Sequence, residues 1–268
     1  MKIGVIGRVD DQAAAAAPGA VTARLASAEA QGYAAAWLRG GDVRSEAALL
    51  FCAAQLAVTT EHIPLGVVAA LAGILHPIRM AEDLAVLDLM CAGRLCWALP
   101  RRLDGAHDDD GLGEAMEIVR QAWSGLAFSH AGRRYSVPEL VCHPAPVRAG
   151  GPALYTAAPL VAGTATRALG GPASEATAFV AHEGEATAHA HVVVASVICD
   201  ANDAAARARA RASGALLAGE PERISDGLEA LVADLAGDPL VLIDSAPAGV
   251  DAESAVRSQR CLAQALFG

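Results

Sequence analysis

The sequence of 268 residues predicts an α/β protein, specifically a compact (β/α)8 barrel of the TIM type. Apolar runs of strand length alternate with alanine-rich segments of helical period, which is typical of βα units around a parallel sheet. Eight such runs are present, and eight is the strand number of this barrel. Because a TIM barrel usually needs about 250 residues, we expect one domain over residues 1–268 with little room for insertions.

Each expected strand is an apolar run bounded by polar residues, glycine or proline. The eight strands, in chain order, are Lys2–Gly7, Tyr33–Leu38, Ile63–Ala70, Arg94–Leu99, Ala153–Ala157, Ala176–Ala181, Ala190–Cys199 and Pro239–Asp244. Apolar residues at helical spacing predict the helices between the early strands. These helices are Gly19–Gln31, Ser45–Thr59, Pro77–Met90 and Glu114–Ser124.

One connection is too short for a regular barrel. Only the segment from His182 to His189 separates the sixth strand from the seventh, whereas a parallel crossover with a helix needs about 10–12 residues. Either one strand is misassigned, or these two strands form an antiparallel hairpin and the barrel is trimmed there.

An open doubly wound sheet is the competing fold, since Gly4-Val-Ile-Gly7 superficially resembles a dinucleotide-binding turn. A third glycine is missing, and the next helix does not begin until about Gly19, so no helix N-terminus is ready to bind a pyrophosphate. The barrel is therefore the better interpretation.

Composition excludes several classes of partner. With 20 Lys and Arg against 30 Asp and Glu, the net charge of −10 repels a nucleic-acid backbone. The longest strongly apolar stretch, Ile63–Leu75, is shorter than the roughly 20 residues that cross a bilayer, and the N-terminus lacks a secretory apolar region. Six cysteines without a C-x-x-C pair are expected to be free thiols, so we predict a cytoplasmic protein. His189 and His191 with Glu185 make an incomplete ligand set, and no metal is predicted.

Residues 76–101, HPIRMAEDLAVLDLMCAGRLCWALPR, resemble the luciferase-like flavin monooxygenase family, in which a helix opened by His-Pro leads through Leu-Asp and Gly-Arg-Leu into the fourth strand. Further segments agree in the same order along the chain. They are residues 28–37, 114–125, 128–135 with 144–148, and 219–224. The resemblance implies a barrel that binds FMN or the deazaflavin F420 at the carboxyl ends of its strands, usually as a dimer joined through helices of the first half.

The resemblance assigns Arg101, directly after the fourth strand, to the flavin phosphate, a role that suits the planar guanidinium. The alternative is a solvated loop arginine. Pro100 stands where the luciferases themselves have cysteine, so this wall of the pocket must differ. Ala69 and Ala70 end the third strand, where the family packs backbone against the flavin ring.

After the fifth strand, the family holds the phosphate with a loop and a helix N-terminus, whose N–H groups are free. In this chain the corresponding residues are Thr156, Ala157, Gly163 and Thr164. Because only the two threonines offer side-chain donors, this anion site has few groups to bind a phosphate, and a plain helix cap is the alternative.

The catalytic Glu-His pair that luciferases carry after the second strand is missing, since this chain reads Arg39-Gly-Gly-Asp42 there. Arg39 and Asp42 are candidates to bind a polar substrate or steady a peroxide, and a solvated ion pair is the alternative. His182, next to Glu183 after the sixth strand, is a further candidate acid or base.

Three functions follow from the resemblance. The first is a monooxygenase that uses reduced FMN, supplied by a flavin reductase, and oxygen on a small organic substrate. The second is an F420-dependent oxidoreductase that transfers a hydride. The third is a flavin-binding accessory protein without catalysis. In each case a homodimer, or a heterodimer with a related subunit, is expected.

Overall fold

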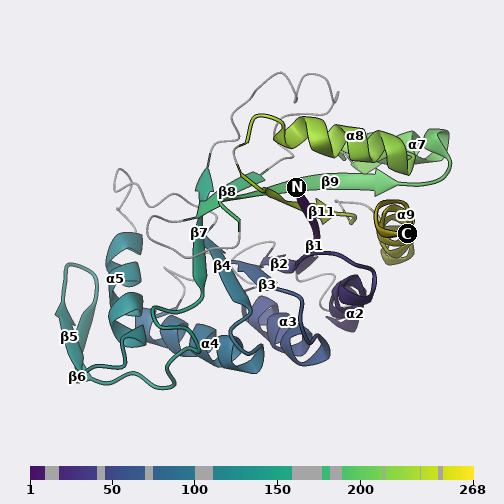
Figure 1. The fold of residues 1–268 in the computed structure, drawn as a ribbon. Helices are drawn as coiled ribbons and strands as arrows, with labels where there is room; N and C mark the ends of the chain where they lie inside the picture. Colours follow the sequence, from purple (N-terminus) through teal and green to yellow (C-terminus); the bar gives the residue numbers. More distant parts are fainter. Residues whose placement is uncertain are drawn as a thin grey trace.

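Eight strands close into a barrel in the computed structural model, which describes residues 1–9, 18–40, 46–69, 75–99, 111–158, 177–181, 189–213, 215–235, 237–246 and 250–268 (Figure 1). In their order around the barrel the strands are β1 (Lys2–Val9), β2 (Ala36–Gly40), β3 (Leu65–Val68), β4 (Leu95–Leu99), β7 (Ala153–Ala158), β8 (Thr177–Ala181), β9 (His191–Cys199) and β11 (Leu240–Asp244). The pairs β8–β9 and β1–β11 complete the ring. All eight predicted strands and the predicted barrel are confirmed.

β8 runs against its two neighbours. It pairs antiparallel with β7, where Tyr155 lies opposite Ala181, and with β9, where Thr177 lies opposite Val194. The other pairs around the ring are parallel. Of the two alternatives for this short connection, a misassigned strand or an antiparallel hairpin, the structure has the hairpin, because reversing one strand removes the need for a long crossover.

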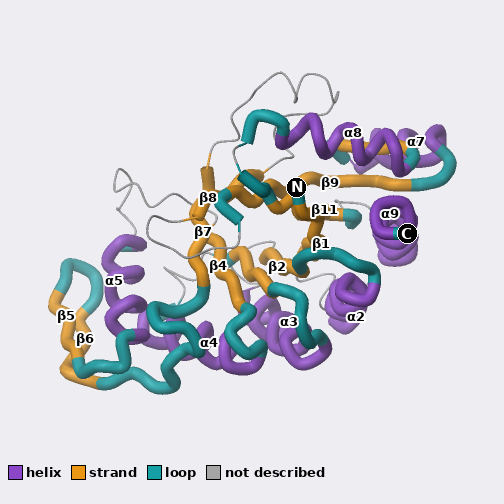
Figure 2. Tube along the Cα trace, in the orientation of Figure 1, coloured by secondary structure: helices purple, strands orange, loops and turns teal. Residues whose placement is uncertain are grey.

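Helices pack around the outside of this barrel, as the tube in Figure 2 shows. Their bounds are α2 (Pro18–Ala30), α3 (Glu46–Thr59), α4 (Pro77–Met90), α5 (Leu112–Trp123), α7 (Asp203–Ser213), α8 (Pro221–Val232) and α9 (Ala252–Phe267). The four predicted helices correspond to α2 through α5. In the described part of the chain, no helix combines the length and the apolar character needed to cross a membrane.

Two small features were not predicted. The hairpin of β5 (Phe128–Ala131) and β6 (Ser136–Leu140) stands outside the barrel beside α5, and β10 (Leu217–Gly219) adds to the edge of β9. Both strands of the hairpin are mostly half-buried or exposed, so they lack the apolar runs that identified the barrel strands.

The strands alternate between two apolar cores. One fills the barrel and includes Ile6, Trp37, Tyr155 and Phe179, while the other lies between the barrel and the helices. Trp37 meets Tyr155 edge to face at 5.7 Å between ring centroids. A Cβ added at Gly66 would lie 2.1 Å from the Trp37 ring, so the indole fits only because this neighbour has no side chain.

The segment that carries the family resemblance ties two turns together at one end of the barrel. After α4, Gly93 at φ +79° donates its N–H to Asp88 O at 2.8 Å and closes the helix. The guanidinium of Arg94 then donates to Ile63 O at 2.6 Å and to Thr60 O at 2.9 Å, in the turn after α3. Leu-Asp and Gly-Arg-Leu are thus structural at this end, where the parallel strands begin.

Replacing Gly66 with alanine is expected to lower the free energy of unfolding by about 1–3 kcal/mol, because the new methyl group forces the Trp37 ring out of the packed barrel. Urea denaturation measures the free energy of unfolding of the variant and of the wild-type protein. Gly19→Ala is the matched control, since no atom lies within 4 Å of its added Cβ. Equal stability of the two variants would show that the barrel interior is not tightly packed.

Candidate functional site

The parallel strands of the barrel end together at one face, which we call the mouth. Ligand sites of such barrels lie at this face. The described interior positions nearest to it are small or apolar on one side, at Val68, Ala98 and Ala157, and polar or charged on the other, at Arg39, Ser196 and Asp244. The mouth therefore has an apolar half and an ionic half.

Arg39, near the end of β2, forms an ion pair with Asp244 at the end of β11, across the intervening β1. The distance from Nη2 to Oδ2 is 2.7 Å, and the side chains are 34% and 1% exposed. Asp244 Oδ1 accepts the N–H of Ala246 at 3.0 Å. Both oxygens of this buried carboxylate are thus hydrogen-bonded, as burial of a charge requires.

A second arginine stands beside this pair. Arg8 on β1 lies opposite Arg39 in register, two residues after the interior residue Ile6, and it is exposed. Strand alternation places Arg8 on the interior side of β1 at the mouth. The Nε of Arg39 is buried and has no hydrogen-bond partner among the described residues. Two guanidinium groups therefore stand beside the Asp244 carboxylate in this part of the mouth.

The ionic half of the mouth is supported from outside the barrel by Arg24 of α2. Its Nη1 donates to Ser245 Oγ and to Gln259 Oε1 of α9, both at 3.0 Å. Burial lowers the pKa of Arg24, while the negative charge of Asp244 raises it. The Tyr33 hydroxyl donates to Gln259 O at 2.7 Å, and burial raises the pKa of this phenol. Arg24 therefore links β11, α2 and α9.

The structure places four of the predicted site residues. Arg39 is at the mouth, and Ala157 is a half-buried interior residue. Ala69 is buried in the outer core, and its carbonyl accepts the Trp97 Nε1–H at 3.1 Å. Thr156 is also buried, and strand alternation places it on the face opposite the interior residue Tyr155. Arg39 and Ala157 thus share the interior side, whereas Ala69 and Thr156 do not.

The remaining predicted residues lie outside the described residues. They are Asp42, Ala70, Pro100, Arg101, Gly163, Thr164 and His182. For His182 the expectation depended on a sixth strand that runs toward the mouth. That premise is wrong, because β8 is antiparallel and its last residue, Ala181, lies toward the end where the neighbouring strands begin.

The sequence did not predict Asp244 and Arg8 as residues of the site. A signal for Asp244 was present, since an acid follows directly on the apolar run Leu240–Ile243 at a strand end. Its partner Arg39 is 205 positions away, so the pair itself is visible only in the fold. Among the described residues no cluster of three or more histidine, cysteine or acidic side chains is arranged to hold a metal.

Other histidines have structural partners. His76 Nδ1 accepts the N–H of Ile78 at 3.3 Å and caps α4, and its ring meets Tyr135 edge to face. His130 Nε2 lies 3.1 Å from Glu114 Oε1, and this carboxylate also accepts the N–H groups of Arg134 and Tyr135. These backbone hydrogen bonds lower the pKa of Glu114. The carboxylate thereby fixes the β5–β6 hairpin to the first turn of α5.

Solved structures share this architecture. A monooxygenase, RslO1 from Streptomyces bottropensis, superposes with a TM-score of 0.75 at 18% identity, covering 100% of this chain and 99% of that one. The oxygenating constituent of 3,6-diketocamphane monooxygenase from Pseudomonas putida, in complex with FMN, gives 0.67 at 15% identity, with 98% and 97% covered. An F420-dependent secondary alcohol dehydrogenase gives 0.66 at 12% identity, with 97% of each chain covered. These likenesses establish a TIM-type barrel.

The sequence comparisons define the family. A family model described as luciferase-like monooxygenase matches residues 1–225, so this chain belongs to the luciferase-like monooxygenase family, as the resemblance predicted. A curated relative is the oxygenase component of the flavin-dependent trigonelline monooxygenase of Acinetobacter baylyi (strain ATCC 33305 / BD413 / ADP1), 26% identical over 117 residues. The aligned part is 39% of this chain and spans about a third, 32%, of that relative.

Asp244→Asn is expected to lower the free energy of unfolding by about 2–4 kcal/mol, because it leaves Arg39 and Arg24 without their buried counter-charge. Thermal or urea denaturation measures the change. The control is Asp83→Asn, which removes the exposed pair with Arg79 and should cost less than about 1 kcal/mol. If both variants were equally stable, the Asp244 pair would contribute no more than a surface ion pair.

Proposed function

We propose that this chain is the oxygenase of a two-component system, acting with reduced FMN and oxygen on a small organic substrate. The observation that carries the proposal is the ionic half of the mouth, where Arg8 and Arg39 place two guanidinium groups beside Asp244, next to an apolar half in a chain of this family. Such a mouth suits a flat, anionic ring system whose one face needs apolar contact.

The described residues fit the cofactor. The apolar half offers Ala157, a half-buried residue with a short side chain, and the other half offers a guanidinium with an unpartnered Nε. Arg101, from the sequence, would bind the phosphate together with Thr164. When bound, the reduced flavin supplies the electrons that activate oxygen, so the protein needs few acids or bases of its own.

The chain's own residues have three roles in this proposal. Asp244 fixes the guanidinium of Arg39 in one orientation, and Arg39 then donates hydrogen bonds to an anionic oxygen at the mouth. The packed interior below, with Trp37 and Tyr155, prevents water from entering through the barrel. This arrangement can bind and orient a reactant without the Glu-His pair of the luciferases.

F420 is the second candidate cofactor, because the barrel is shared with an F420-dependent alcohol dehydrogenase at nearly the same TM-score as with the FMN complex. A competition titration of the two cofactors distinguishes them. We rank FMN first because the curated relative is a flavin-dependent oxygenase component, which also supports a separate flavin reductase as the partner.

Purified protein is expected to bind reduced FMN in the micromolar range and to slow its reoxidation by oxygen, as followed by stopped-flow absorbance. Arg39→Ala should weaken binding about tenfold, the loss of one charge-assisted hydrogen bond. The control Arg79→Ala alters an exposed arginine on α4 and should leave binding unchanged. An unchanged rate of flavin reoxidation with the wild-type protein would contradict the proposal.

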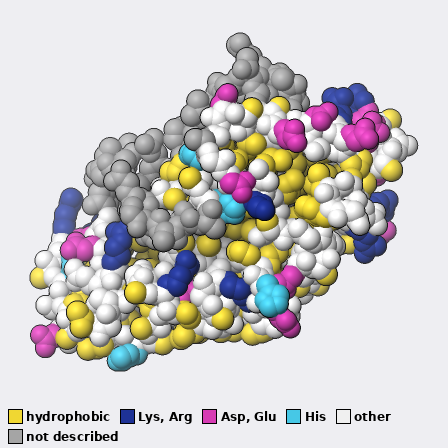
Figure 3. All heavy atoms as spheres, in the orientation of Figure 1, with side chains coloured by type: hydrophobic (Ala, Val, Ile, Leu, Met, Phe, Trp, Pro, Cys, Tyr) yellow, Lys and Arg dark blue, Asp and Glu magenta, His cyan; other side chains and the backbone are white. Residues whose placement is uncertain are grey.

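We also propose that the protein is a homodimer joined through α3 and α4. These helices pack together and expose apolar side chains that a soluble monomer would normally bury. The exposed residues are Phe51 and Val58 on α3, 58% and 68% exposed, and Val86, Leu89 and Met90 on α4. Apolar side chains lie along the lower edge of Figure 3, where Figure 1 places these helices.

Phe51→Glu is expected to convert the dimer to a monomer, because it places a charge in the apolar contact. Sedimentation velocity measures the mass. Leu126→Glu is the control, since Leu126 is 70% exposed but lies in the turn before β5. A wild-type monomer, or a Phe51→Glu dimer, would disprove this interface.

A further inference from the structure

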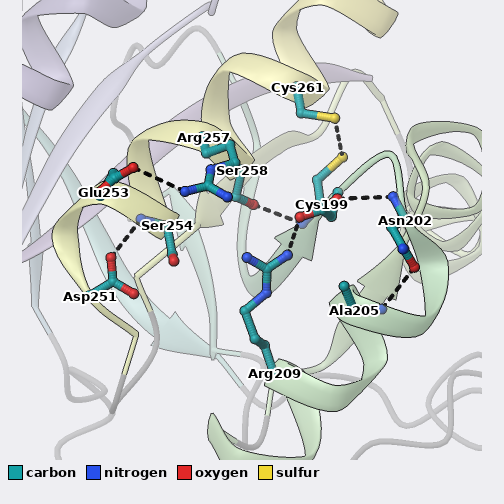
Figure 4. A network of polar contacts seen from close by, with 11 residues as sticks. Cys199, Asn202, Ala205, Arg209, Asp251, Glu253, Ser254, Arg257, Ser258 and Cys261 are labelled. Atoms are coloured by element: carbon teal, nitrogen blue, oxygen red, sulfur yellow. Dashed lines mark hydrogen bonds and ion pairs between the residues drawn. The ribbon is translucent and has the colours of Figure 1, made fainter.

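Two thiols from distant parts of the chain are in contact on the outside of the barrel. Cys199 is the last residue of β9, Cys261 lies in the middle of α9, and their Sγ atoms are 3.5 Å apart (Figure 4). Both are free cysteines. A disulfide has an S–S length of about 2.05 Å, so the sulfurs need to approach by only about 1.5 Å.

The backbone on each side of this pair is held in place. The N–H of Cys199 donates to Ser258 Oγ of α9 at 2.7 Å, three residues before Cys261. Asp200, the next residue, accepts the N–H of Asn202 at 2.9 Å and pairs with Arg209 of α7. Asp251 caps the start of α9 through the N–H of Ser254 at 2.8 Å. The two thiols therefore face each other on fixed elements, as Figure 4 shows.

We propose that Cys199 and Cys261 form an oxidative modification site, in which hydrogen peroxide or an organic hydroperoxide converts the two thiols reversibly to a disulfide between β9 and α9. The site lies on the outer side of β9, because Cys199 belongs to the core between barrel and helices. The proposal is independent of the flavin reaction proposed above.

The exposure of the two thiols sets the order of the steps. Cys261 is partly exposed, whereas Cys199 is buried, and burial together with the neighbouring thiol raises the pKa of Cys199. The Cys261 thiol loses its proton and its sulfur attacks one peroxide oxygen. The O–O bond breaks, Cys261 becomes a sulfenic acid, and the other oxygen takes up the proton and leaves as water, or as an alcohol from an organic hydroperoxide. The Cys199 sulfur then attacks the sulfenic sulfur, the S–O bond breaks, and the hydroxyl group leaves with the Cys199 proton as water. Two thiols lose two electrons, and the O–O bond of the peroxide gains them.

The disulfide would connect residues 62 positions apart and enclose α7, β10, α8 and β11. Closing so long a loop reduces the freedom of the unfolded chain, so oxidation should raise the melting temperature by about 3–8 °C. A reductant such as dithiothreitol should reverse the change.

The experiment treats the full chain with stoichiometric hydrogen peroxide and follows intact mass, peptide mapping and melting temperature. We expect a mass loss of about 2 Da, two hydrogen atoms, and a single crosslinked peptide pair containing Cys199 and Cys261. Cys261→Ser should abolish both the mass loss and the rise in melting temperature. Cys142→Ala, a buried cysteine elsewhere in the outer core, is the control and should retain both.

Two outcomes would overturn the proposal. One is oxygen addition at a single cysteine of the wild-type chain without a crosslink. The other is a crosslink that joins different cysteines or persists in Cys261→Ser. Peptide mapping of the wild-type protein decides the question even if a variant does not fold.

Discussion

The buried carboxylate of Asp244 is the interaction on which the mouth of the barrel depends. A charge at the end of an apolar strand is stable only when opposite charge and hydrogen bonds compensate for the lost water. Arg39 provides a positive charge and a hydrogen bond from inside the barrel, and the N–H of Ala246 donates a hydrogen bond from the following turn. Arg24 adds positive charge from outside the barrel. Because Asp244 interacts with both arginines, the orientation of Arg39 at the mouth is coupled to the packing of α2 and α9, the two helices that hold Arg24.

Closure of the barrel imposes a second constraint. A closed ring of strands leaves an interior that side chains must fill, and the large rings of Trp37, Tyr155 and Phe179 fill it where Gly66 makes space. The reversed strand β8 satisfies the remaining hydrogen bonds of β7 and β9. It also changes which residues reach the mouth, since β8 begins near it, at Thr177, and ends away from it. Chemistry that a parallel strand would place at the mouth must therefore come from other strands.

The sequence predicted the strands well because most barrel strands, such as β3, β9 and β11, are buried on both faces and read as continuous apolar runs. It also predicted the family, but two residues of the resembling segment, Gly93 and Arg94, close a turn at the end of the barrel opposite the mouth. The Arg39–Asp244 pair could not be predicted, because its members lie 205 positions apart and neither belongs to a local motif. The β5–β6 hairpin was not predicted, because its short strands bury little apolar surface.

Helix α9 contacts both the support of the ionic half of the mouth and the pair of thiols at the end of β9. Within one turn it presents Ser258 and Cys261 to the end of β9 and Gln259 to Arg24, which stands next to Asp244. A helix interior is rigid on the scale of an ångström, so a change that fixes α9 against β9 also fixes the side chain that positions Arg24. The support of the ionic half of the mouth and the paired thiols therefore depend on the same helix, although they face different strands.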